Sequence, residues 1–261
     1  MGKRNREHYA KGSNKKPKSG AKLLEPNTAG IYATCPRGKE KQCRQELMTV
    51  LSEKITEYFD LPENDDNKSE ETNALSIEEK IQQELSEMKE ADKNTKANYL
   101  QPIDVDIECV VFIKTRKPVD PVMLVEKYAQ ECYDSGVKTT RNTQKLTPIS
   151  DSCRATTDPE DHLKDLARRV LAPHFHARDR KPVKFAIQVS KKNFDTLTSE
   201  VIIKAVAETV GRDHGHTVDL KNYDKLIIVE CYKNNIGMSV VENYLKYSKF
   251  NLQQIYDKVS R

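Results

Sequence analysis

The stretch KLIIVECYKNNIGMSVV, from Lys225 to Val241, carries the clearest structural pattern of the chain. An apolar run, KLIIVECY, is followed by the polar letters KNN and by a second apolar run. Two strand-like runs around a turn rich in Asn and Gly predict a β-hairpin. We expect Asn234, Asn235 and Gly237 to supply the turn. This hairpin either only closes a sheet or also presents its tip to a ligand.

Helices and strands alternate on both sides of the hairpin. The predicted elements of the second half are a helix that starts at Asp158–Pro159, a strand KFAIQVSK (184–191), a helix capped by Thr198 or Ser199 and ended by Gly211, a strand HTVDL (216–220) and an amphipathic stretch over 243–259. Proline at the first helical position and glycine after the last turn are common helix boundaries. Strands separated by helices favour an α/β domain with some parallel pairing.

The first half shows the same alternation around a polar interruption. Its predicted elements are a strand IYAT (31–34), a helix over 40–59, a strand VDIECVVFIK (105–114), a helix from Asp120–Pro121 to Tyr133 and an extended segment over 145–149. Between the first helix and the second strand, residues 63–98 hold eleven acids against five lysines. The predicted fold class is therefore α/β (α+β), beginning with a small ferredoxin-like unit that is opened by an acidic insertion.

Three parts of the chain follow from these patterns: a basic arm (1–25), a ferredoxin-like domain (26–142) with the insertion 63–98, and a second domain (143–261). The first 22 residues have eight Lys and Arg against Glu7 and no aliphatic run, so we expect the arm to be disordered. It is either a solubilising tail with a nuclear address or a source of phosphate contacts. In the insertion, Ser76 and Glu79 match a capping box ahead of one amphipathic helix, which either grips a partner or docks weakly.

The charge of the chain is unevenly distributed. Residues 135–261 hold 22 basic and 15 acidic residues, a net charge of +7, and the insertion has a net charge of −6. Basic charge on the arm and the second domain indicates a polyanionic partner. No apolar run reaches the roughly 20 residues that span a bilayer, so no membrane association is expected. Six scattered cysteines without a CxxC pair predict reduced intracellular thiols.

Several motifs resemble parts of catalytic or metal sites. These are the HxH pairs at 174–176 and 214–216, the loop between Gly211 and Gly215, Ser239 and Cys153. The histidine pairs lack a third ligand at metal-site spacing, and the loop follows a helix instead of opening one. The serine lacks the second glycine of GxSxG, and no base can be paired with the cysteine. The sequence therefore predicts no catalytic residue, no metal site and no cofactor of its own.

Basic and amide residues recur where the predicted elements of the second half end. The candidate RNA-binding residues are Arg154, Arg168, Arg169, Lys191, Lys192, Asn193, Arg212, Lys221, Lys233 and Asn234. We place Arg168 and Arg169 on the polar side of a helix, Lys191 to Asn193 at a strand end and the others in turns. Such residues form either a nucleic-acid surface or an ordinary solvated one. Because the chain has no Trp and no RNP-type aromatic strand, recognition of RNA backbone and shape is favoured over base stacking.

Three segments, in order, resemble the THUMP-domain proteins that serve as adaptors for tRNA cytidine acetylation. They are KLTPISDSCRAT (145–156), KFAIQVSKKN (184–193) and VDLKNYDKLIIVECYKNNIGMSVVENYLKYSKFNLQQI (218–255). The resemblance extends over roughly residues 26–256, leaving out the insertion, and is most specific from Val218 onward. It implies a THUMP domain over 143–261. It also implies that the family's basic strand-end position falls on Lys191 and Lys192, and that the closing hairpin spans 233–238.

The resemblance further implies a function. The two domains would grip tRNA, and the chain would present a D-arm cytidine of serine and leucine tRNAs to a separate RNA cytidine acetyltransferase, which forms N4-acetylcytidine. Acetyl-CoA and ATP would belong to that partner, and the chain itself would not be an enzyme. Nuclear, in particular nucleolar, localisation is expected, with the cytoplasm as a further location. The alternatives are an RNA-modifying enzyme that acts alone and a protein-interaction scaffold that does not contact RNA.

Overall fold

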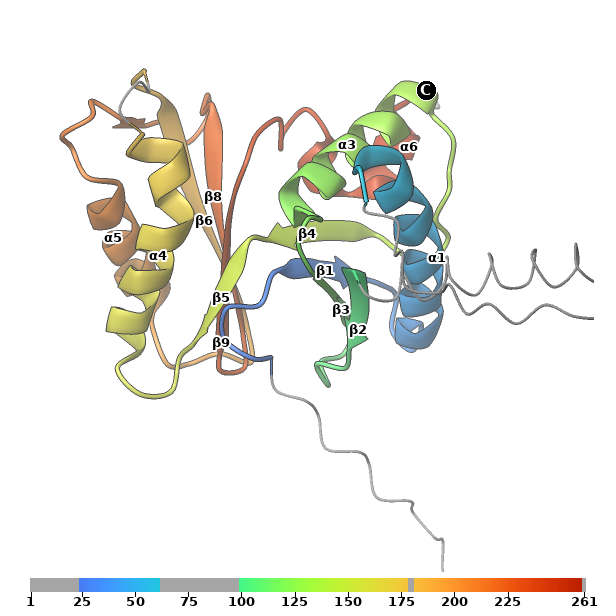
Figure 1. Cartoon of the computed structure of the whole chain (residues 1–261), viewed down its shortest axis with the longest axis horizontal. Helices are drawn as coiled ribbons and strands as arrows, with labels where there is room; N and C mark the ends of the chain where they lie inside the picture. Colours follow the sequence, from blue (N-terminus) through green and yellow to red (C-terminus); the bar gives the residue numbers. More distant parts are fainter. Residues whose placement is uncertain (1–23, 62–98, 178–180, 260–261) are drawn as a thin grey trace, which may run out of the picture.

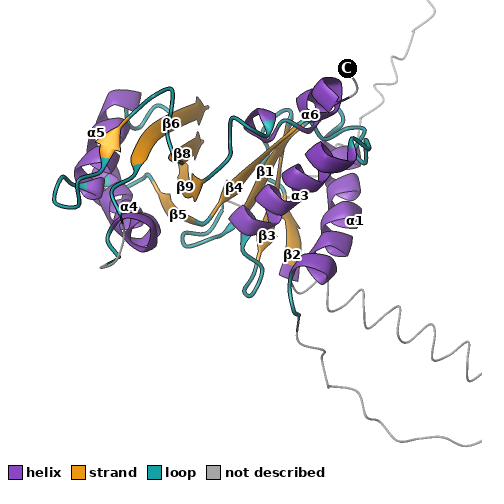
Figure 2. Cartoon of the chain, turned by 90° about the horizontal axis from the view of Figure 1, so that it is seen from above, coloured by secondary structure: helices purple, strands orange, loops and turns teal. Residues whose placement is uncertain are grey.

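The computed structural model describes residues 24–61, 99–177 and 181–259. The predicted insertion, with its capping box, and residues 1–23 of the predicted arm lie outside the described residues. Two sheets stand side by side, and each carries helices on one face (Figure 1, Figure 2). Among the described residues, no helix combines the length and apolarity that crossing a membrane requires.

The first sheet has four antiparallel strands in the order β2-β3-β1-β4. Its unit consists of β1 (Gly30–Thr34), α1 (Glu40–Tyr58), β2 (Leu100–Ile103), β3 (Val110–Thr115), α3 (Pro121–Ser135) and β4 (Lys145–Ile149). Ile31 and Ala33 of β1 face the helices, whereas Tyr32 faces the other side, as the period of a strand requires. This βαββαβ order is that of a ferredoxin-like fold, and the prediction is confirmed.

One strand of the first sheet was not predicted. β2 has the sequence LQPI, and proline cannot donate a hydrogen bond to a neighbouring strand. Pro102 is nevertheless tolerated because β2 is the outermost strand and pairs only with β3.

The predicted strand over 105–114 is shorter in the structure. β3 begins only at Val110, because Asp106 and Cys109 have φ values of 48° and 62°, which interrupt an extended chain. Residues 104–109 form a loop instead, and Val105 and Ile107 of this loop are buried against the sheet face that lacks helices. We call residues 104–109 the acidic loop, after Asp104, Asp106 and Glu108.

The second sheet has five strands in the order β5-β9-β8-β6-β7. Its unit consists of β5 (Asp151–Arg154), α4 (Pro159–Phe175), β6 (Lys184–Lys192), α5 (Ser199–Val210), β7 (Thr217–Val218), β8 (Lys225–Tyr232) and β9 (Asn235–Val241). β6 pairs in parallel with β7 and β8, and the remaining pairs are antiparallel, so the predicted parallel pairing is confirmed. α4 and α5 cover one face of this sheet (Figure 2).

The hairpin of β8 and β9 has a different turn from the predicted one. Only Lys233 and Asn234 lie between the strands, and Lys233 has a φ of 54°. Asn235 and Gly237 belong to β9. A Cβ atom on Gly237 would lie 2.8 Å from Cγ2 of Ile149 in the first sheet, so glycine is needed there for the close approach of the two units.

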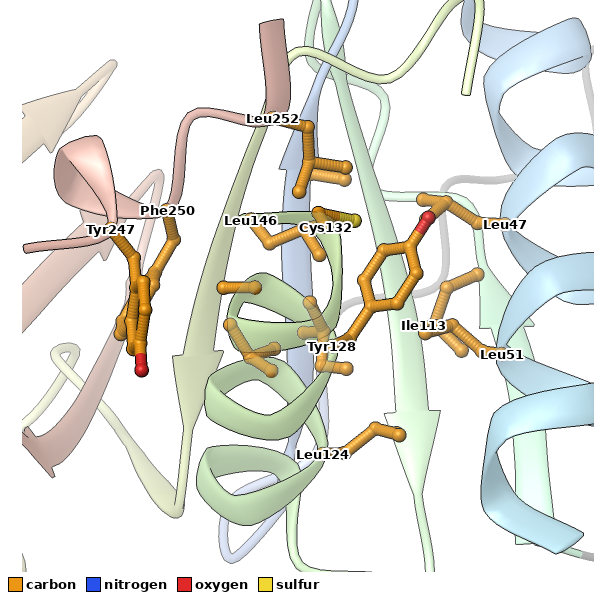
Figure 3. Close-up of a cluster of buried hydrophobic side chains, with 14 of the residues drawn as sticks. Leu47, Leu51, Ile113, Leu124, Tyr128, Cys132, Leu146, Tyr247, Phe250 and Leu252 are labelled. Carbon is orange, nitrogen blue, oxygen red and sulfur yellow. The ribbon is translucent and has the colours of Figure 1, made fainter. Parts of the chain in front are cut away.

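The chain returns to the first unit at its end. The predicted amphipathic stretch over 243–259 contains a short 3-10 turn (Ser248–Phe250) and the helix α6 (Leu252–Val259). Figure 3 shows Leu252 near Cys132 of α3 and Phe250 beside Tyr247, and all four side chains belong to the same buried cluster. The tyrosine hydroxyl of Tyr256 accepts from the backbone N–H of Thr139 at 3.1 Å.

One hydrophobic core joins the two units. It contains the inner faces of α1, α3 and the first sheet together with Ala186, Leu226, Ile228 and Val241 of the second sheet. The chain passes from one sheet to the other between Ile149 and Asp151, so β4 lies in the first sheet although the domain division we predicted starts the second domain at residue 143. The second sheet is thus covered on both faces.

Candidate nucleic-acid interface

Four strands of the second sheet meet at one edge. Lys192 of β6 lies opposite Tyr232 of β8. Asn235 of β9 lies opposite both Tyr232 and Arg154, the last residue of β5. Six predicted RNA-binding residues therefore gather here, and we call them the strand-end edge: Arg154, Lys191, Lys192, Asn193, Lys233 and Asn234. We predicted that Arg154 lies in a turn. In the structure it is instead the last residue of strand β5.

The basic side chains of the strand-end edge differ in their contacts. Lys191 donates to the backbone oxygen of Leu197 at 2.8 Å, with its Nζ 5.7 Å from the ring centre of Phe194. Lys192 donates to the backbone oxygen of Glu108, and Lys233 forms an ion pair of 3.1 Å with Asp106. Arg154 is exposed. Two of the lysines are therefore held by the acidic loop of the other unit, whereas Arg154 and Lys191 are not.

Arg168 and Arg169 lie on α4, away from the strand-end edge. Arg168 is 68% exposed and pairs with Asp165 at 2.7 Å. Arg169 donates to Asp151 at 2.8 Å and to the side chain of Asn27 at 3.0 Å. The second arginine therefore ties α4 to the start of β5 and to the segment before β1.

Arg212 and Lys221 lie at the opposite end of the second sheet. Arg212 follows α5, which runs back from the strand-end edge, and Lys221 precedes the first residue of β8. Both residues are exposed. Because they are separated from the strand-end edge by the length of the strands, the ten predicted residues do not form one surface.

A basic cleft between the units was not predicted. It has a volume of about 1180 Å³ and is bordered by Asn27 and Ala29, residues 114–121, Ser150, Asp151 and Arg169. Lys114, Arg116, Lys117 and Arg169 outnumber the two carboxylates of its lining, Asp120 and Asp151, and Asp151 pairs with Arg169. The run KTRKP at the end of β3 was visible in the sequence. A search for basic residues at strand ends in the first half, like the one made in the second half, would have identified this cleft.

Aromatic residues on the first sheet do not form an open base-stacking surface. Tyr32 of β1 and Phe112 of β3 lie opposite each other, with ring centres 4.6 Å apart. Exposed aromatic residues on such central strands can stack bases. Here each ring is only 1% exposed, and Tyr232 of the second sheet lies 4.4 Å from Tyr32. These rings therefore join the two units.

The side chains that we weighed as nucleophiles are buried. Cys153 is 6% exposed, and burial raises the pKa of its thiol to about 12, so the thiolate that would attack a substrate is disfavoured. Ser239 is fully buried, and its hydroxyl donates to the backbone oxygen of Pro148 at 2.7 Å. Neither group can reach a substrate in this structure.

Three of the four histidines of the HxH pairs come together in space, whereas His174 borders a separate cleft beside α3. The ring centres of His176 and His214 are 5.6 Å apart, and those of His214 and His216 are 6.0 Å apart. His216 is buried between the backbone N–H of Val183 and the backbone oxygen of Phe175, which occupy both ring nitrogens. Within the described part of the chain, no three or more His, Cys, Asp or Glu residues are placed to hold a metal ion.

Comparison with known proteins identifies the second unit. Residues 158–241 match the THUMP domain. This range runs from the residue before α4 to the end of β9 and includes every member of the strand-end edge except Arg154. The fold and the matched range thus define a THUMP-domain protein with a ferredoxin-like unit in front of that domain.

Relatives cover nearly the whole chain. It is 43% identical over 266 residues to "tRNA acetyltransferase TAN1" of Saccharomyces cerevisiae, which covers 95% of this chain and 91% of that protein. It is 36% identical over 233 residues to the uncharacterized protein C25H2.10c of Schizosaccharomyces pombe, with 89% and 77% covered. It is 28% identical over 242 residues to "THUMP domain-containing protein 1" of Bos taurus, with 90% and 65% covered. The chain belongs to the THUMP-domain family of these proteins.

Proposed function

We propose that this chain binds tRNA and presents it to a separate RNA cytidine acetyltransferase. It acts as a non-catalytic adaptor for N4-acetylcytidine formation in the D arm, with serine and leucine tRNAs as the substrates. The observation that carries the proposal is the strand-end edge, where the sheet register gathers four basic and two amide side chains. Membership of a family whose yeast member is named a tRNA acetyltransferase supports the type of RNA and the modification.

The position of the first described residue supports a role for the basic arm. The chain enters the structure beside the ends of β5 and β9 (Figure 1). There the backbone N–H of Asn27 donates to Ser152 of β5 at 2.7 Å. The arm, with eight Lys and Arg in residues 1–22, is therefore attached close to the second sheet and adds to the attraction for phosphates.

Contact with RNA is tested by ultraviolet crosslinking of the protein in cells, followed by sequencing of the RNA and mapping of the crosslinked peptides. We expect tRNA to dominate the RNA, and the peptides to contain residues 184–197 or 225–241. Crosslinks without tRNA would favour a protein scaffold instead. Microscopy of the tagged chain tests the proposed nuclear and nucleolar localisation.

The second candidate function is an acetyltransferase that acts alone, which the name of the yeast relative favours. Purified chain is incubated with tRNA, acetyl-CoA and ATP, with and without the purified RNA cytidine acetyltransferase. An adaptor gives N4-acetylcytidine only when both proteins are present. Product formed by the chain alone would refute the adaptor role.

A further inference from the structure

The acidic loop places a carboxylate where an RNA phosphate would bind. Oδ2 of Asp106 lies 3.1 Å from Nζ of Lys233, and the backbone oxygen of Glu108 accepts from Lys192. The ion pair crosses from the ferredoxin-like unit to the second unit, and its side chains are 68% and 33% exposed. A phosphate approaching Lys233 from solvent therefore meets the Asp106 carboxylate already in place.

The structure assigns to Asp106 the role of a built-in competitor for RNA phosphates: its carboxylate occupies Lys233, and only an anion that displaces it can use this lysine. The inference rests on the proposed binding of RNA at the strand-end edge. Exposed ion pairs contribute little to stability, so a phosphate can displace the carboxylate. An isolated phosphate gains little from the exchange. A folded RNA that also contacts Arg154 and Lys191 offsets the loss through its other phosphates.

The acidic loop is held in this position by its own contacts. Asp104 accepts a hydrogen bond from the backbone N–H of Asp106 at 3.1 Å, and Glu40 accepts from the backbone N–H of Cys109 at 2.9 Å. Val105 and Ile107 are buried beneath the loop. Because the loop is anchored on both sides of Asp106, its carboxylate remains beside Lys233 and competes with every incoming anion.

A pair of charge-removing variants isolates this contact. Asp106→Asn removes the charge, and asparagine tolerates the φ of 48° at this position. The matched control is Glu108→Gln, which removes the same charge two residues further on, where the carboxylate pairs with Arg37 at 3.3 Å and not with the strand-end edge. A difference between the two variants therefore reports the position of the charge and not its loss.

The probes are a 12-nucleotide oligouridine and unfractionated tRNA, titrated against the full chain at several salt concentrations. We expect Asp106→Asn to bind oligouridine up to about fivefold more tightly than wild type, which is the equivalent of one exposed ion pair. The slope of log affinity against log salt should steepen by about 0.7, for one more phosphate contact. Affinity for tRNA should rise by at least as much, because tRNA no longer spends free energy on displacing the carboxylate, but its salt slope should stay unchanged because tRNA already contacts Lys233 in wild type.

Three outcomes would overturn the inference. Equal gains in Asp106→Asn and Glu108→Gln would show a general charge effect. A gain that persists when Lys233→Gln is added to Asp106→Asn would show that the released lysine is not the cause. Unchanged binding by Asp106→Asn would remove Asp106 from the interface while leaving RNA binding intact. If wild type and all variants fail to bind either RNA, the proposed function itself fails.

Discussion

Glu126 shows how the joining of the two units changes the chemistry of one residue. It lies on α3 in a cleft of about 350 Å³ that also involves Val240 and Asn243 of the second unit. Burial raises the pKa of its carboxyl to about 7, although the backbone N–H of Glu242 donates to it at 2.6 Å. The charge of Glu242 raises that pKa further.

This pKa makes stability depend on pH. The folded chain retains a proton on Glu126 that the unfolded chain releases near its ordinary pKa of 4.5. The contribution of the protonated carboxyl is therefore complete below about pH 4.5 and is lost as the pH rises through about 7. Glu126→Gln keeps the acceptor and cannot ionise, so we expect it to be more stable than wild type at pH 8, by about 1 kcal/mol.

Urea unfolding at pH 4.5, 6 and 8 measures the difference. The advantage of Glu126→Gln should shrink towards zero at pH 4.5. Asp134→Asn, an exposed change of the same charge on the same helix, is the control and should show no such trend. An advantage of Glu126→Gln that does not change with pH would contradict the assignment.

At single positions, the sequence predicts the role of a residue when that role depends on residues nearby in the chain. Thr198 caps α5 as expected, because its hydroxyl accepts from the N–H of Val201. Gly237 was predicted to lie in the hairpin turn, but it lies in β9. A glycine is needed there because Ile149 of the other sheet approaches its backbone closely. Nothing in the letters around Gly237 indicates that contact.

At the scale of elements, Glu46 fixes the connection between α3 and β4. Its carboxylate accepts from the backbone N–H groups of Arg141, Asn142 and Thr143, at 2.8, 3.0 and 3.0 Å. Burial raises the pKa of Glu46, but these hydrogen bonds outweigh it and hold the pKa below its ordinary value. The charged carboxylate of α1 is thus part of the loop that leads into the first sheet.

We expect Glu46→Gln to lower the free energy of unfolding at pH 7 by about 1.5–3 kcal/mol, the usual contribution of hydrogen bonds to a charged group. A lowered folded pKa contributes stability above the unfolded pKa, and acidification removes it. The difference between the two proteins should therefore begin to narrow near the ordinary carboxyl pKa of 4.5 and disappear only as the pH falls through the lowered pKa of the folded state. Chemical unfolding at pH 4 and pH 7 tests this. Equal stability of the two proteins at pH 7 would show that the hydrogen bonds to the Glu46 carboxylate do not stabilise the fold.

Long elements were predictable and short edge elements were not. The helices of both units and the strands over 184–191 and 225–232 follow from their own periodicity. β2 contains a proline, β5 has four residues and β7 has two, so none of them carries enough pattern to be separated from a loop or bounded correctly. Whether these segments form strands, and where the strands end, depends on pairing with strands that are distant in the sequence.

At the scale of the whole molecule, the last helix joins the end of the chain to the first unit. Leu252 is fully buried in the core shared with α3, and its backbone N–H donates to the oxygen of Gln144 at 2.7 Å (Figure 3). The two units therefore share one core around α3 and α6, although the sequence predicted two consecutive domains.

Leu252→Ala should lower the free energy of unfolding by about 2–5 kcal/mol, because it leaves a cavity in the shared core. Hydrogen exchange should become faster in α3 as well as in α6. Ile202→Ala, an equally buried change in the core beneath α5, is the control and should leave α3 less affected at matched stability. Protection of α3 that is unchanged in Leu252→Ala would show that the last helix is not part of the first unit.

The separation of basic residues between the two ends of the second sheet allows the central claim to be tested directly. Arg154→Ala/Lys191→Ala removes two charges from the strand-end edge, and Arg212→Ala/Lys221→Ala removes two from the other end. The measurement is the slope of log tRNA affinity against log salt. In Arg154→Ala/Lys191→Ala, the loss of two phosphate contacts should weaken binding and make the slope shallower by about 1.4, the value for single-stranded RNA. Arg212→Ala/Lys221→Ala should show neither change. Equal slopes for both variants, or a larger loss in the second, would contradict RNA binding at the strand-end edge.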